Sequence, residues 1–313
     1  MPLTWDDEID AILGADLTAA LGYRTPAGGT VVVAVAPIGL RDRAAGTVGF
    51  TTSLAFGNKL ARIADDPRVA MAFHARDHGS ADSPAYVLVQ GRAWVLRDPT
   101  PEQRARVETL ATAFLGGRKR GPFWDRWLRE YYDVRVQVHV DVDRITVWPD
   151  LRCAGTPRVV GADPAEEPPP PQRPPKNGTG PRVDAERAGR RVRGTAHVLL
   201  GLVATDGYPL VLPVDVGSQG PDGLAVSARF PLPAGGRRAG LLGHSYRPQL
   251  IGLEARQYTG WLQVGEDGRG LYAPHTEHGY KAPANKTLLL FLNGALAKRG
   301  VRKARRAGAP ALD

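Results

Sequence analysis

Valine stands at every second position of one segment, with polar side chains between. The alternating residues are Val134, Val136, Val138, Val140 and Val142, separated by Arg135, Gln137, His139 and Asp141. A period of two is typical of a strand with one buried and one polar face. The pattern predicts a long strand that continues to Trp148.

Shorter apolar runs predict more strands in the first 160 residues, with helices between them. The strands are expected at Leu17–Tyr23, Thr30–Ile38, Gly46–Thr52, Val69–Ala75 and Ala85–Leu96. Helices are expected at Asp6–Leu13, Leu54–Asp65, Pro101–Leu115 and Phe123–Tyr132. The Asp66-Pro67 pair ends the second helix, because a residue before proline is driven out of the helical region.

The later part of the chain follows a similar pattern. Strands are predicted at His197–Thr205, Leu210–Val216, Gly223–Arg229, Leu250–Ala255 and Tyr258–Val264. The Asp206-Gly207 dipeptide is a strong hairpin turn between the first two. Helices are predicted at Arg237–Leu242 and from Asn285 to about Arg306, where leucines form an apolar face.

A proline-rich segment divides the chain. Eight of the 21 residues from Gly161 to Pro181 are proline. Such a segment favours extended polyproline geometry and cannot pair as a strand. We therefore expect a domain over residues 1–160, a linker over 161–181 and a second domain over 182–313.

The two halves share an order of elements, which suggests two copies of one β unit. Gly46–Thr52 corresponds to Gly223–Arg229, Lys59 falls near Arg237 and Arg238, Asp66-Pro67-Arg68-Val69 corresponds to Tyr246–Leu250, and Gly91–Trp94 corresponds to Gly260–Gln263. The valine-rich strand that ends at Trp148 has no evident counterpart after Val264. The fold class expected is mainly β, with two tandem β domains.

Composition excludes several classes of protein. The single cysteine, Cys153, rules out an internal disulfide framework and is read as inert. No apolar stretch approaches the 18 or so residues that suggest a membrane span. The acidic first ten residues do not match a secretory or transit peptide. A cytoplasmic protein without a membrane partner is expected.

The formal net charge of +9 is concentrated near the end of the sequence. Six basic residues fall between Lys298 and Arg306, without an acidic residue among them. Such a tail can bind nucleic acid by counterion release, but a solvated helix end is the commoner interpretation. Nucleic acid is therefore not the expected partner.

An anion-binding arrangement is the most specific chemistry in the sequence, because the glycine motifs of dinucleotide and P-loop sites and the serine elbow of hydrolases are missing. Thr51, Thr52 and Ser53 end a strand, and Asn58 and Lys59 follow at the start of a helix. Hydroxyls, free helical N–H groups and an ammonium suit a phosphate. The alternative is that the hydroxyls only cap the helix and Lys59 is a surface charge.

The second half offers a weaker version of this site. Gly235 and Gly236 precede Arg237 and Arg238, and Ser227 ends the preceding strand as Thr51 does. Adjacent arginines can bind phosphate or carboxylate, or they can be solvated in a glycine-rich turn. The histidines at 244, 275 and 278 leave a metal or a haem ligand open, although their spacing supports neither strongly.

The motifs of the first half, in their order, resemble those of the pyridoxamine 5′-phosphate oxidase-like, FMN-binding split-barrel superfamily. The matching segments are Asp6–Leu13, Phe50–Ser53 with Asn58-Lys59-Leu60, Asp66–Val69, Val89–Ala93, Trp127–Tyr132 and Ile145–Trp148. The likeness covers about residues 5–150, and residues 195–275 are similar to a diverged second copy. It implies two tandem split β-barrels.

The resemblance also implies the cofactor and its ligands. FMN, or a deazaflavin in one branch, would be held at its phosphate by Thr51, Thr52, Ser53 and Lys59, with Gln90 and Arg92 near the ring. The strand Val33–Leu40 lacks the cations of true pyridoxamine phosphate oxidases. Oxidation of vitamin B6 phosphate is therefore not the expected activity.

Two functions remain open from the sequence. The first is an FMN- or deazaflavin-dependent oxidoreductase acting on a small molecule that the sequence does not identify; hydride transfer is the cofactor's own chemistry, so no catalytic residue is named. The alternative is a non-enzymatic flavin-, haem- or anion-binding protein or regulator. A cofactor groove between two barrels could form in a homodimer or, through the linker, as a pseudo-dimer within one chain.

Overall fold

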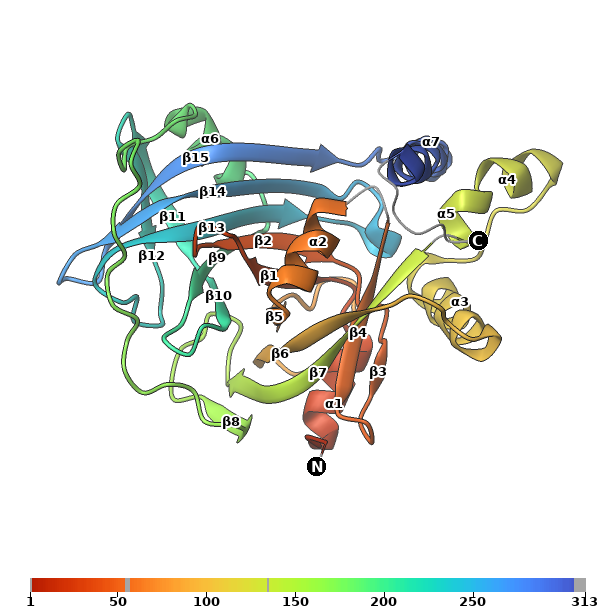
Figure 1. Cartoon of the computed structure of the whole chain (residues 1–313), viewed down its shortest axis with the longest axis horizontal. Helices are drawn as coiled ribbons and strands as arrows, with labels where there is room; N and C mark the ends of the chain where they lie inside the picture. The colour runs from red at the N-terminus through yellow and green to blue at the C-terminus, as the bar shows by residue number, and fades with distance from the viewer. Residues whose placement is uncertain (1, 54–56, 134, 307–313) are drawn as a thin grey trace.

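The computed structural model describes residues 2–53, 57–133 and 135–306, and it contains two antiparallel sheets, one in each half of the chain (Figure 1). The first sheet is built from β1 (Ala19–Arg24), β2 (Thr30–Val35), β3 (Arg41–Asp42), β4 (Thr47–Ser53), β5 (Arg68–Phe73), β6 (Tyr86–Leu96), β7 (Arg135–Trp148) and β8 (Arg158–Gly161). The second is built from β9 (His197–Val203), β10 (Pro209–Pro213), β11 (Asp215–Gly220), β12 (Gly223–Ser227), β13 (Gly235–Ser245), β14 (Glu254–Val264) and β15 (Gly270–Lys281). The predicted mainly β class is confirmed.

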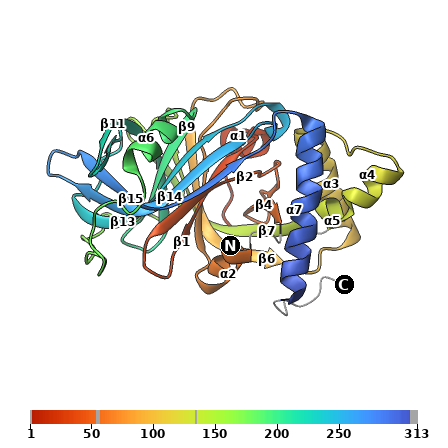
Figure 2. The same cartoon turned by 90° about the horizontal axis from the view of Figure 1, so that it is seen from above.

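Helices lie at the margins of these sheets. They are α1 (Asp7–Ala15), α2 (Gly57–Asp65), α3 (Pro101–Leu115), α4 (Pro122–Trp127), α5 (Arg129–Asp133), α6 (Ala185–Arg193) and α7 (Lys286–Arg306), with a short 3-10 turn at Pro248–Leu250. Helix α7 returns to the first half, where Phe291 stacks on Trp127 with ring centroids 4.5 Å apart (Figure 2). None of the described helices is long and apolar enough to cross a bilayer.

The sequence predictions for these helices largely hold. Helix α3 has the predicted bounds, and the segment predicted as one helix at Phe123–Tyr132 is broken into α4 and α5. Leu54, the predicted start of the second helix, and Val134, the first alternating valine, lie outside the described residues, as do the side chains of residues 303–306 in the basic tail.

The two sheets have the same strand order. It is β2-β1-β5-β6-β7-β4-β3 in the first and β10-β9-β13-β14-β15-β12-β11 in the second, with β8 added beside β7. A bridge between Ala36 and Thr51 brings the chain after β2 against β4 and curls the first sheet toward closure. The chain therefore contains the same β unit twice.

Three sequence predictions about the second half are wrong. The valine-rich strand β7 does have a counterpart, because β15 occupies its place. Residues Arg237–Leu242 lie in strand β13 and not in a helix, since this segment forms the buried centre of the second sheet. The predicted strand Leu250–Ala255 falls mostly on the 3-10 turn and the residues after it, because β14 begins only at Glu254, whereas the predicted strand Tyr258–Val264 is confirmed as the later part of β14.

These corrections change the alignment of the halves. Strand β13 is the counterpart of β5, so Arg237 does not correspond to Lys59, and Tyr246 follows its strand whereas Asp66 precedes its own. The predicted match of Gly46–Thr52 with Gly223–Arg229 is confirmed, because β4 and β12 hold the same place in the two sheets.

A bulge fixes the alignment at one residue. The register shifts between Gln90 and Gly91 in the first sheet and between Thr259 and Gly260 in the second. A Cβ on Gly91 would stand 2.1 Å from the Asp141 carbonyl oxygen, and one on Gly260 would stand 2.2 Å from that of Ala273. Glycine is required at both bulges because the neighbouring strand passes too close for a side chain. The predicted match of Gly91 with Gly260 is confirmed.

The hydrogen-bonded ladders carry this alignment across the sheets. Outward pairing from the two bulges aligns Gly22 with Gly201, Val32 with Val211, Thr51 with Ser227 and His74 with His244.

The two sheets contact each other reciprocally at aligned positions. A Cβ on Gly22 would stand 2.6 Å from Val211 Cγ2, and a Cβ on Gly201 would stand 2.3 Å from Val32 Cγ2. Such an exchange of equivalent contacts is the mark of two-fold symmetry. One hydrophobic core accordingly joins residues of both halves. The junction forms within one chain, as the pseudo-dimer alternative anticipates.

Two aligned histidines meet at this junction. His74 Nε2 lies 2.7 Å from His244 Nε2, and His74 Nδ1 lies 3.0 Å from the Ala72 carbonyl oxygen. A carbonyl only accepts, so Nδ1 of His74 carries the proton and its Nε2 accepts from His244 Nε2–H. Burial holds both rings neutral: it lowers the pKa of His74 to about 3 and lowers the pKa of His244 as well.

The histidine pair makes the free energy of unfolding depend on pH. An unfolded histidine takes up a proton near pH 6.5, whereas the folded pair stays neutral, so stability is lost as pH falls below 6.5. Each ring contributes up to about 1.4 kcal/mol per pH unit. Denaturant unfolding from pH 7 to 5 is expected to show this slope, and the double variant His74→Met/His244→Met should show a smaller one. Equal slopes would contradict a neutral buried pair.

Candidate functional site

A buried lysine faces the end of strand β4. Lys59 lies in the first turns of α2, is 9% exposed, and its Nζ donates to Thr52 Oγ1 at 2.7 Å. The ammonium also stands 5.4 Å from the Phe50 ring centroid. Burial lowers the pKa of Lys59 to about 8. Lys59 is therefore not a surface charge, and the surface alternative from the sequence is wrong.

The fold of this segment explains the placement of Lys59. Helix α2 buries Lys59 and Ile63, which are four residues apart and share one face. The helix ends at Asp65, where Asp66 accepts from Arg24 and from Arg68 before strand β5 begins. This short helix is thus fixed at its end and turns its ammonium inward.

A second cation, which the sequence analysis missed, lies beside these hydroxyls. Arg135 begins β7 opposite Ser53, and its Nη1 donates to Thr51 Oγ1 at 3.2 Å. Its Nη2 donates to the Tyr131 hydroxyl at 3.1 Å. In the sequence, Arg135 is marked only as a polar position in the valine alternation. Its place beside the end of β4 depends on the pairing register of β4 and β7, which the sequence pattern does not give.

We name Thr51, Thr52, Lys59 and Arg135 the β4 cluster. In it the Thr52 hydroxyl contacts the ammonium and the Thr51 hydroxyl contacts the guanidinium. Because successive side chains of a strand point to opposite faces, the two pairs lie on opposite sides of β4, and the donors of either pair suit the oxygens of a phosphate. Of the other predicted residues, Ser53 is half-buried at the end of the strand and Asn58 is exposed in the helix.

Gln90 binds the second half of the chain. Its Nε2 donates to the Pro209 carbonyl oxygen at 2.6 Å, and its Oε1 accepts from Arg144 Nε at 2.5 Å. Arg144 in turn pairs with Asp206 at 2.5 Å. Arg92 is exposed one residue beyond the bulge. The structure therefore uses the Gln90 side chain to join the halves.

The residues predicted for the second copy are dispersed. Ser227 is aligned with Thr51, but it is exposed at the end of β12. Arg237 donates to the carbonyl oxygens of Pro169, Pro233 and Ala234, and Arg238 donates to Gln172 and Arg173. Both arginines thus hold the chain around the proline-rich segment, and neither is part of the β4 cluster.

The described residues contain no group of three or more histidine, cysteine or acidic side chains arranged to hold a metal ion. The three histidines singled out in the sequence lie apart: His244 is in the junction pair, whereas His275 and His278 are on β15. Burial raises the pKa of the Cys153 thiol well above its usual range. A thiol in this state is a poor nucleophile, in agreement with its interpretation as inert.

No protein-family model matches the chain, and no curated protein matches it. Solved structures do. A conserved hypothetical protein of Mycobacterium tuberculosis is similar with 21% identity and a TM-score of 0.36, over 49% of this chain and 89% of the other. A Clostridium acetobutylicum protein related to general stress protein 26, of the pyridoxine phosphate oxidase family, has 12% identity and a TM-score of 0.33, over 50% and 96%.

An F420 reductase is also similar, with 22% identity and a TM-score of 0.31, over 44% of this chain and 94% of the other. Each of these three matches spans nearly the whole neighbour but only about half of this chain. The predicted resemblance to the pyridoxamine 5′-phosphate oxidase-like split-barrel superfamily is confirmed as a likeness of fold.

Proposed function

We propose that the β4 cluster binds the phosphate of FMN or of a related deazaflavin, and that the chain is an oxidoreductase acting on a small molecule. The observation that carries the proposal is the buried ammonium of Lys59 at the Thr52 hydroxyl, with Arg135 at the Thr51 hydroxyl beside it.

Electrostatics favours an anion at this place. Burial disfavours the charged form of an ammonium, and here it lowers the pKa of Lys59 to about 8. A phosphate at the Thr52 hydroxyl would favour the charged form of Lys59 and would accept from the ammonium and from that hydroxyl. The bound coenzyme would supply hydride-transfer chemistry, and the protein side chains would bind and orient it.

A second candidate is a coenzyme-binding protein without turnover. The sequence predicts Gln90 beside the coenzyme ring, but in the structure its side chain is hydrogen-bonded to Pro209 and Arg144. This difference favours a protein that binds the coenzyme without turnover. The absorbance spectrum and mass of any co-purified small molecule, followed by a test of its reduction by nicotinamide nucleotides, separates the two.

Replacement of Lys59 by methionine tests the phosphate site. The variant should bind FMN about 10–100-fold more weakly, because a charge-assisted hydrogen bond contributes about 1.5–3 kcal/mol. Its free energy of unfolding without coenzyme should be unchanged or higher, since an apolar side chain avoids the cost of a buried charge. Fluorescence titration and denaturant unfolding measure the two effects.

Lys176→Met is the matched control, because Lys176 is exposed in the proline-rich segment. It removes the same charge and should leave affinity unchanged. Unaltered FMN affinity in Lys59→Met, or no uptake of FMN or deazaflavin by the wild-type chain at saturating concentration, would refute the proposed site.

The pH dependence of binding provides a separate test. The ammonium is the binding form of Lys59, and its pKa is about 8 before the anion arrives. Affinity for FMN should be level near pH 7 and should fall above pH 8, by at most about tenfold per pH unit. Titrations from pH 7 to 9.5 should show this decline in the wild type and a flat profile in Lys59→Met. A wild-type profile as flat as the variant's would count against the role of Lys59.

A further inference from the structure

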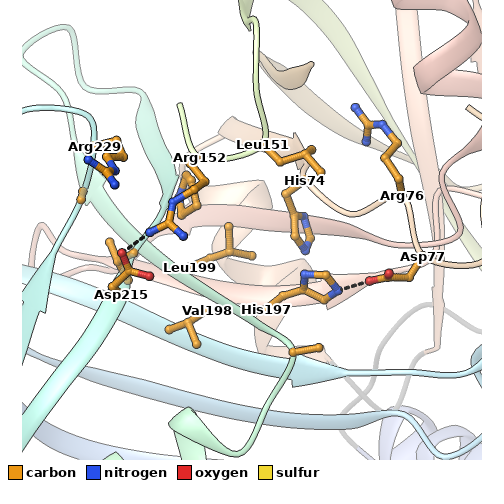
Figure 3. A pocket seen from close by; sticks show the side chains of 14 residues that line it. His74, Arg76, Asp77, Leu151, Arg152, His197, Val198, Leu199, Asp215 and Arg229 are labelled. Atoms are coloured by element: carbon orange, nitrogen blue, oxygen red, sulfur yellow. Dashed lines mark hydrogen bonds and ion pairs between the residues drawn. The ribbon is translucent and has the colours of Figure 1, made fainter. Parts of the chain in front are cut away.

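A cavity of about 270 Å³ lies where the two halves meet, away from the β4 cluster. Its walls come from both halves: His74, Asp77 and Arg152 from the first, and His197, Asp215 and Arg229 from the second (Figure 3). Leu151, Val198 and Leu199 supply apolar wall between these polar groups.

The internal repeat shows which residues of the first copy correspond to those that border this cavity. Ala228 and Arg229 border it and are aligned with Thr52 and Ser53, because they follow Ser227 as those residues follow Thr51. Residues 228–234, all of them described, form no helix between β12 and β13. At this strand end the second copy therefore has an arginine that borders a cavity, whereas the first copy has Ser53 and then helix α2.

Arg229 is an exposed cation at one end of the cavity. Among the described residues, no hydrogen bond or ion pair is formed by its side chain. Its neighbour Phe230 packs edge-on against Trp148, with ring centroids 5.9 Å apart. The backbone that carries Arg229 is thus anchored in the shared core while its guanidinium stays available.

Arg152 provides a second guanidinium from the other half. It lies on a tight turn in which the Asp150 carboxylate accepts from the backbone N–H groups of Arg152 and Ala154, both at 2.9 Å. The guanidinium pairs with Asp215 on β11 (Figure 3). The turn and the ion pair together hold Arg152 at the cavity on the same side as Arg229.

The opposite end of the cavity is polar and carries the carboxylate of Asp77. His197 Nε2 lies 2.6 Å from Asp77 Oδ2, and the His197 ring meets the buried His74 ring edge-on at 5.4 Å. Arg76, also in the wall, is paired with the buried Asp16 at 2.5 Å. Arg76 and Arg152 are thus each paired with a carboxylate, whereas the Arg229 side chain forms no ion pair with a described residue.

We propose that this cavity binds a small organic anion, whose carboxylate or phosphate group is held by Arg229 and Arg152 and whose other end reaches His197. The planar forks of two arginines match the oxygens of such a group. The volume lies below the range of about 300–1,000 Å³ that is usual for drug-sized ligands, which favours a compact molecule. This site is independent of the proposed coenzyme site at β4.

Calorimetric titration of the full chain with inorganic phosphate and, separately, with succinate tests the proposal. At least one anion should bind saturably, and the preferred one identifies the head group. Arg229→Gln should weaken that binding by about tenfold or more. Arg269→Gln removes the same charge from a turn where the side chain is 87% exposed, and it should leave anion affinity unchanged.

Lys59→Met separates the two sites, because it should leave anion binding in this cavity intact while FMN affinity falls. If Arg229→Gln does not fold, Arg229→Lys keeps the charge, loses the planar fork and should still bind more weakly. Absence of saturable binding of both anions, or equal affinity in the Arg229 variant and the wild type, would overturn the proposal.

Discussion

The close approach of the two sheets at Gly22 and Gly201 determines how the rest of the chain is arranged. Each glycine admits a valine from the other half, Val211 or Val32, at a distance that no side chain would allow. The shared hydrophobic core lies behind this contact and draws on both halves. Because each half buries this face against the other, we expect the halves to fold as one cooperative unit.

The two copies match where they pack against each other, and they differ at the strand ends where we propose that ligands bind. The bulge glycines and the histidine pair are repeated or closely matched in both copies, since each is in contact with its counterpart or with a backbone. The strand ends have diverged: β4 leads to a helix with a buried lysine, whereas β12 leads to a proline-containing turn and an arginine at a cavity. The two copies of one unit thereby present different side chains at corresponding strand ends.

The sequence predicted what depends on local periodicity. The valine alternation of β7 and the apolar pattern of α3 predicted those elements correctly, because neighbouring residues alone determine such patterns. Strand β13 was missed because Arg237–Leu242 has a composition compatible with a helix, and only its central place in the sheet overrides that preference. Strand β15 was missed because Pro274 and several polar residues interrupt its alternation, at the bulge opposite Gly260. Thr52 and Lys59 were found from their order, but Arg135 and Arg229 depend on the register and on the packing of the halves.

The contrast between Lys59 and Arg237 shows why a buried cation is not by itself a ligand site. A proline-rich segment has carbonyl oxygens but few N–H groups, so its acceptors need donors from elsewhere. Arg237, a residue that is 2% exposed, donates to one carbonyl oxygen of this segment, that of Pro169, and to two in the turn before β13, those of Pro233 and Ala234. Its polar contacts are thus those of a structural clamp that holds the chain between the halves against β13. Lys59 instead donates to a hydroxyl, which can itself rotate and donate to an incoming oxygen. The partner of the cation, more than its burial, therefore separates a residue that holds the fold from one suited to hold an anion.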